Sequence, residues 1–152
     1  MARMTVKIEG LRELDRALGE LPKSVAKATL RRVLKEAAEP MARAARQLAP
    51  RDEYHLYESI DVSTRLNRRQ SQIHRKEASK AFQEMFVGTN NPAGVQQEFG
   101  NSRHGAQPFM RSAWDAEKRP TLDRIANSLW AEIQKSAQRE AAKARRLAAK
   151  GK

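Results

Sequence analysis

The sequence predicts an α+β domain in which a small antiparallel sheet of three to four strands packs against long N- and C-terminal helices. Apolar residues recur at helical spacing in the first and last thirds of the chain, which are rich in alanine. In the middle third they alternate with polar residues over short segments, which is the spacing of strands. Strands that cluster between helical ends favour helices packed on one small antiparallel sheet. At 152 residues the chain has the length of a single domain.

Two helices are expected in the first third of the chain. Residues 5–9 alternate and predict a short strand, after which leucines recur at helical spacing from residue 11 to residue 21. Pro22 ends this first helix, and a longer helical pattern runs from Lys23 to Leu48. Pro40 interrupts the longer pattern and removes one backbone hydrogen bond, so we expect a kink or a break there.

The middle third contains the expected strands and a basic segment between them. Residues 57–63 and 82–88 predict strands, and residues 95–100 predict one more short strand or a helical turn. The polar segment from Arg65 to Lys80 is predicted to be an exposed arm or extended loop that contacts a neighbouring subunit or partner. The cations assigned to this contact are Arg65, Arg68, Arg69, Arg75, Lys76 and Lys80.

The last third is predicted to be helical and to end in a basic tail. A helix is expected from Pro108 to Glu117, and Pro120 restarts or bends the pattern, which then continues to Ile133. The apolar face fades from residue 135, so residues 1–134 are interpreted as a single domain and residues 135–152 as a helical tail. The tail cations that are candidates for DNA contact are Arg139, Lys143, Arg145 and Arg146.

The charge of the chain indicates a polyanionic or acidic partner. Thirty Lys and Arg residues face 18 Asp and Glu residues, which gives a formal net charge of +12. Such a surface attracts nucleic acid, anionic lipid or acidic proteins. The basic arm carries no interleaved aromatic residues, which disfavours base stacking on single strands. Nonspecific DNA contact therefore stands beside two alternatives, a solvated charged surface and docking on a neighbouring protein.

Catalytic and metal-binding patterns are not found in the sequence. The chain has no cysteine, which excludes thiolate zinc sites and cysteine nucleophiles. His55, His74 and His104 lie in polar segments without a second ligand at metal-binding spacing, and the pair Asp52–Glu53 is interpreted as a solvated turn. We expect no catalytic residue, no metal and no cofactor. A secretory signal and a membrane-spanning segment are not expected either.

Several short motifs in the second half predict a compact corner. Gly100 permits a positive φ angle after the preceding element, and Pro108 fixes the approach to the last helix. Phe99 and Phe109 are expected to be core anchors of this corner, with Trp114 as a further apolar contact. From the residues alone, this set indicates an ordinary corner of a hydrophobic core.

In their order along the chain, these motifs resemble the signature of tail-completion proteins, the head–tail joining or neck proteins of lambdoid long-tailed phages. That pattern has a helix ending in Ala-Pro, a Ser-Ile strand start, a Val-Gly strand, a Glu-Phe-Gly element and a Pro-Phe-hydrophobic-Arg-x-Ala run. Two departures are the lack of a glycine between Pro50 and Ser59 and the presence of Ser112 where a second proline is usual. The matching positions are Pro50, Ser59, Ile60, Gly88, Glu98, Phe99, Gly100, Pro108, Phe109, Arg111 and Ala113.

The resemblance implies a structural protein of the virion rather than an enzyme. Such a protein forms a homo-oligomeric ring, with six-fold symmetry as one option, around the channel for double-stranded DNA. It joins or completes the head–tail connection beside neighbouring neck and tail proteins, after assembly in the host bacterial cytoplasm and without membrane contact. The alternative is a small basic protein that binds DNA nonspecifically, and an enzyme acting on DNA ranks third.

Overall fold

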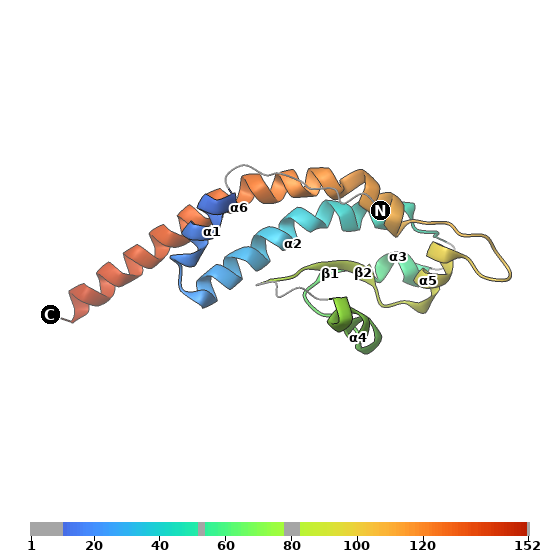
Figure 1. Cartoon of the computed structure of the whole chain (residues 1–152), viewed down its shortest axis with the longest axis horizontal. Helices are drawn as coiled ribbons and strands as arrows, with labels where there is room; N and C mark the ends of the chain where they lie inside the picture. Colours follow the sequence, from blue (N-terminus) through green and yellow to red (C-terminus); the bar gives the residue numbers. More distant parts are fainter. Residues whose placement is uncertain (1–10, 52–53, 78–82, 152) are drawn as a thin grey trace.

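The computed structural model describes residues 11–51, 54–77 and 83–151. Its fold is α+β as expected, mostly helical, with two antiparallel strands among these residues. The elements in chain order are α1 (Leu11–Gly19), α2 (Lys23–Leu48), α3 (Tyr54–Glu58), β1 (Ile60–Ser63), α4 (Arg68–Glu77), β2 (Phe86–Thr89), α5 (Pro92–Phe99) and α6 (Met110–Lys150). Figure 1 shows the two long helices α2 and α6 lying along one another, with the strands and the short helices α3, α4 and α5 on one side of α2.

The two long helices α2 and α6 pack closely through small side chains. Ala42 and Ala45 on α2 and Ala113 on α6 are fully buried, and such small residues let the two backbones approach. The main core extends from this contact to the short elements beside α2. Its buried members are Ala38, Ala42, Ala45, Ala49, Leu56, Ile60, Val62, Phe109 and Ala113.

Neither long helix is broken at its internal proline. Pro40 lies inside α2 and Pro120 inside α6, and both helices continue through these positions. The break that was one of two outcomes expected at Pro40 does not occur. At Pro120, where a restart or a bend was expected, α6 continues as one helix. An internal proline costs about 3 kcal/mol. Packing of both flanks of each helix in the same α2–α6 interface offsets this cost, and in Figure 1 the two helices curve together.

The sheet consists of β1 and β2 in antiparallel register, with Ile60 opposite Thr89 and Ser63 opposite Phe86. Ile60 and Val62 are buried toward the helices, and the intervening Asp61 is exposed. The sequence predicted three to four strands. Residues 95–100, for which a strand or a helical turn was expected, lie mostly in helix α5, and the strand expected at residues 5–9 lies outside the described residues.

The basic segment is a helix rather than an extended loop, because α4 spans most of it. Asn67 and Gln70 explain where α4 begins. The Gln70 backbone N–H donates to the Asn67 side-chain oxygen at 2.8 Å, and the Asn67 backbone N–H donates to the Gln70 side-chain oxygen at 3.0 Å. This reciprocal pair is a capping box. It satisfies two donors that a short polar helix would otherwise leave to solvent.

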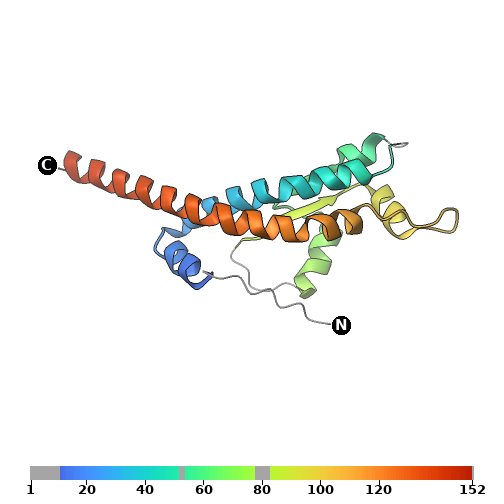
Figure 2. The same ribbon diagram turned by 90° about the horizontal axis from the view of Figure 1, so that it is seen from above.

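A second, smaller core lies at the other end of the long helices, where α1 packs against α6. Its buried members are Leu14, Leu21, Ala26 and Ile133. Beside it, the hydroxyls of Thr29 and Ser136 are both buried and lie 2.9 Å apart. The predicted tail therefore starts with one packed turn. Residues 141–150 are exposed throughout, and Figures 1 and 2 show this end of α6 extending past the beginning of α2.

The two phenylalanines of the predicted corner have opposite environments. Phe109 is 1% exposed, in agreement with the prediction, whereas Phe99 is 66% exposed and is not a core anchor. The prediction for Phe99 was wrong because α5 is a helix, which directs Glu98 inward and Phe99 outward. Trp114 is also exposed rather than anchored in the core.

Replacing Phe109 with alanine is expected to lower the free energy of unfolding by about 3–5 kcal/mol, the usual cost of removing a buried aromatic side chain. Phe99→Ala is the matched control and is expected to change it by less than about 1 kcal/mol. Urea unfolding followed by circular dichroism measures both values. Equal destabilisation by the two substitutions would contradict this assignment of core and surface.

Candidate functional site

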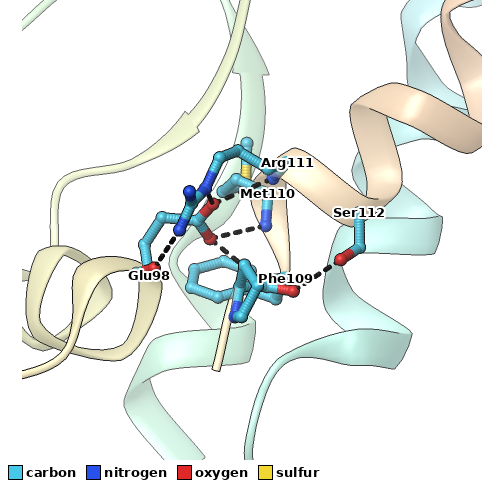
Figure 3. A network of polar contacts seen from close by, with 6 residues as sticks. Glu98, Phe109, Met110, Arg111 and Ser112 are labelled. Carbon is cyan, nitrogen blue, oxygen red and sulfur yellow. Dashed lines mark hydrogen bonds and ion pairs between the residues drawn. The ribbon is translucent and has the colours of Figure 1, made fainter. Parts of the chain in front are cut away.

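The carboxylate of Glu98 caps the N-terminus of α6 from a distant part of the chain. One oxygen accepts the backbone N–H groups of Phe109 and Met110, each at 2.9 Å, and the other accepts the backbone N–H of Arg111 at 3.0 Å (Figure 3). The first N–H groups of a helix have no partner within the helix. A carboxylate at this position satisfies them and is also favoured by the helix dipole.

Arg111 fastens the same carboxylate through its side chain. Its Nε donates to Glu98 at 2.8 Å, and its Nη2 donates to the Glu98 backbone carbonyl at 2.5 Å. The guanidinium also lies over the ring of Phe99, 5.0 Å from the ring centre. The exposed Phe99 therefore supports the cation that holds the buried Glu98, which is a role on the protein surface rather than in the core.

Burial alone raises the pKa of Glu98, which is only 6% exposed, because it disfavours the charged form. The Arg111 side chain and the three backbone N–H donors act in the opposite direction. Together they outweigh burial and hold the pKa of Glu98 below its usual value. The carboxylate is therefore ionised near neutral pH, as its role as an acceptor of four hydrogen bonds requires.

Gly100 ends α5 in a conformation that favours glycine, with φ at +76°. A Cβ atom there would lie 2.8 Å from the backbone nitrogen of Ala106, so the turn also has no room for a side chain. The loop of residues 101–108 that follows is exposed along its whole length and projects from one end of the molecule (Figures 1 and 2). Gly100 and Glu98 together fix the two ends of this loop.

The other motif positions lie at junctions around the same corner. Ser59 donates to the Leu56 carbonyl at 2.6 Å, and its hydroxyl lies 2.5 Å from that of Thr89, which links the start of β1 to the end of β2. Pro50 follows the C-cap of α2, and Ala113 is completely buried. Gly88 has open space where a Cβ would lie, so steric exclusion does not explain its glycine.

Gly94 is a position that the sequence interpretation missed. A Cβ at Gly94 would lie 2.6 Å from the Thr89 side chain and 3.3 Å from that of Leu56. Asn91 caps α5, because its side-chain oxygen accepts from the Ala93 N–H at 3.0 Å. The segment Asn91-Pro92-Ala93 has the residue types of a helix start, with proline just after the cap, and this signal was available in the sequence.

The cations of α4 form an outward surface. Arg65, Arg68, Arg69 and Arg75 are exposed, and none of them takes part in an ion pair within the described residues. Ile73 is 54% exposed among them. The side chain of Lys76 and the whole of Lys80 lie outside the described part of the chain.

Two hollows lie near the sheet. A cleft of about 480 Å³ lies between α4 and the strands and includes Asp61, Asn67 and Gln70 in its lining. An apolar hollow of about 210 Å³ lies between the long helices and β2, where Met85, Met110 and the exposed Trp114 contribute to its walls. Aromatic and methionine side chains at a surface are typical of protein–protein contacts.

The histidines and acidic residues do not gather into a metal site in the described segments, where no group of three such ligands occurs. His74 pairs with Glu84 at 2.8 Å and lies edge-on to the ring of Phe86. His55 is exposed on α3, His104 bonds to Asn101 within the projecting loop, and Asp52–Glu53 lies outside the described residues. Among the described helices, none is both long enough and apolar enough to cross a membrane.

Of the tail cations, Arg139 lies beside the beginning of α2, where it lines a shallow hollow with Ser24 and Val25. Lys143, Arg145 and Arg146 follow it along the exposed end of α6. Figure 1 places this end far from α4, so the two basic regions predicted from the sequence belong to separate surfaces. A charged helix, a cleft and an apolar hollow are features of a protein that binds other macromolecules.

Comparison of the sequence with known protein families identifies the class of protein to which the chain belongs. The family model described as "Bacteriophage HK97-gp10, putative tail-component" matches residues 12–100, which is more than half of the chain. The chain belongs to this family of phage tail components. The match includes Glu98 and Gly100 and ends before the segment Pro108–Ala113. No curated protein and no solved structure matches the chain at a significant level.

Replacing Glu98 with glutamine is expected to lower the free energy of unfolding by about 1.5–3 kcal/mol near pH 7, because charge-assisted hydrogen bonds are lost. The pKa of Glu98 is lower in the folded protein than in the unfolded chain, where a glutamate has a pKa of about 4.3. The ionised carboxylate therefore stabilises the fold at pH values above about 4.3, and this stabilisation is lost as the pH falls through the pKa of the folded state. The difference between wild type and Glu98→Gln should therefore shrink below about pH 4.3.

The control for this prediction is Glu58→Gln, because Glu58 is exposed and outside the cap. Chemical unfolding at a series of pH values measures all three proteins. A difference between wild type and Glu98→Gln that grows as the pH falls would contradict the assigned role of the carboxylate.

Proposed function

We propose that this tail component is a structural, non-enzymatic subunit of the phage neck or tail end. It forms a homo-oligomeric ring that joins or completes the head–tail connection around the DNA channel, beside other neck and tail proteins. Membership of the tail-component family supports the assignment of this protein as a structural component of the phage tail. The order of the motifs from Pro50 to Ala113 supports the more specific assignment to the neck.

The position of α4 supports an assembly role. A ring needs two different surfaces on each subunit that fit one another and close on themselves. α4 lies beside the sheet, away from α6 (Figure 1), and its Arg68, Arg69 and Arg75 are exposed. Arg69 and Arg75 line a shallow hollow together with the exposed Ile73. Arginine is enriched at protein–protein interfaces. We infer that α4 contacts the next subunit or an adjoining neck protein.

Reversing the three α4 charges in Arg68→Glu, Arg69→Glu and Arg75→Glu is expected to abolish assembly while the melting temperature changes by less than about 2 °C. Exposed charges contribute little to folding, whereas like charges at an interface cost affinity. Size-exclusion chromatography with light scattering measures the ring, and phage complementation measures incorporation into particles.

The matched control reverses three charges on the tail, in Arg139→Glu, Lys143→Glu and Arg146→Glu, and is expected to leave ring formation intact. A triple α4 variant that assembles like wild type would remove α4 from the interface. Early melting of that variant would instead show that these arginines support the fold.

A further inference from the structure

The exposed end of α6 carries a row of cations on one face. An α-helix has 3.6 residues per turn, so residues spaced by four, three and four positions lie one above another. Arg139, Lys143, Arg146 and Lys150 have this spacing, and all four are exposed on the continuous helix. With a rise of about 1.5 Å per residue, this cation row is about 16 Å long. Arg145 projects from a different side of the helix.

The cation row is not neutralised by the protein itself. None of its four residues takes part in an ion pair within the described segments. Glu140 is the single acidic residue from position 135 onward, and it lies about a quarter turn away from the row. The row therefore presents four exposed cations that form no ion pair among the described residues.

Stabilisation of the helix end does not account for the whole row. Cations favour a helix C-terminus through the helix dipole, but the effect is confined to about the last turn. Lys150 and Arg146 lie close enough to benefit. Arg139 and Lys143 lie about two to three turns from the end and gain nothing comparable.

The residues around the cation row on α6 indicate which kind of negatively charged partner it could bind. A helix that inserts into a membrane surface needs large apolar residues opposite its cations, and residues 141–150 supply alanines and only Leu147. Single-stranded nucleic acid is held by aromatic stacking, and this segment has no aromatic residue. A straight, rigid row of charges on a narrow helix fits a straight, rigid polyanion, which is double-stranded DNA.

We propose that the cation row on α6 binds the phosphate backbone of double-stranded DNA without sequence preference. The segment contains no Asn or Gln after Gln138, and its small alanines allow close approach without reading bases. The α4 cations are not part of this site, because α4 lies far from the end of α6 (Figure 1). Binding by the row requires no ring, so it is independent of the proposed neck assembly.

The test compares full-length protein with a row variant, Arg139→Gln, Lys143→Gln, Arg146→Gln and Lys150→Gln. Glutamine keeps nearly the same helix propensity as lysine and arginine. Binding to a fluorescent DNA duplex is measured by anisotropy across a range of salt concentrations. Each phosphate contact contributes about 0.9 to the slope of log K against log salt. Loss of four contacts should therefore reduce the slope by about 3.6.

Two controls distinguish DNA binding by the aligned cation row from DNA binding by the overall positive charge of the protein. The first replaces the same number of cations elsewhere, in Arg68→Gln, Arg69→Gln, Arg75→Gln and Arg145→Gln, and should change the slope by less than about 1. The second exchanges Lys143 with Ala144 and Arg146 with Leu147, which preserves composition and net charge but breaks the row. It should lose roughly half of the salt-dependent slope. Circular dichroism checks that helicity is unchanged.

Three results would overturn the proposal. Equal losses in the row variant and the number-matched control would show that the whole charged surface attracts DNA without a site. Wild-type DNA binding by the row variant, with loss of binding to polyglutamate, would identify an acidic protein contact instead. Binding to phosphatidylglycerol vesicles in the absence of duplex binding would identify a membrane contact. Ring formation by the row variant is measured separately, so failure here leaves the neck proposal standing.

Discussion

The hydrogen bonds between the Glu98 carboxylate and the first turn of α6 are the contact on which the arrangement of this protein depends. They fix the start of a 41-residue helix against α5. The same helix contributes Ala113 to the main core and Ile133 to the second core. A shift at its first turn would move both, because packed interiors transmit displacement rather than absorb it. The Glu-Phe-Gly and Pro-Phe-x-Arg motifs are thus the two halves of one helix cap, completed by Arg111.

Much of the fold could be predicted where a single local pattern decides the outcome. Apolar spacing located α1, α2 and α6, and Gly100 was correctly assigned a positive φ angle. The errors arose where tertiary packing decides. The prolines remain in continuous helices because the α2–α6 contact supports both flanks. Phe99 was misplaced because a short segment of mixed pattern can be a strand or a helix, and the choice reverses which residue faces inward.

The candidate surfaces were only partly predictable. Composition identified the cations of α4 and of the tail, but it carried no information on how far apart the two groups lie. The helix of α4 follows from the Asn67–Gln70 capping box, a four-residue pattern that the strongly polar composition obscured. The cleft and the apolar hollow were beyond prediction, since their walls depend on how β1, α4 and β2, and the two long helices and β2, pack together in three dimensions.

The placement of charge in this molecule separates folding from binding. The cores are built from alanine, aliphatic residues and Phe109, and Glu98, the one carboxylate that is buried among the described residues, is fully engaged in the cap. Arg46 and Arg124, which do contact the packed elements, are each paired with an acidic residue. Further cations are exposed on α4 and on the end of α6, where exposed charges contribute little to stability. In the proposals made above, α4 would contact protein and the end of α6 would contact DNA, and neither surface contributes to the buried cores.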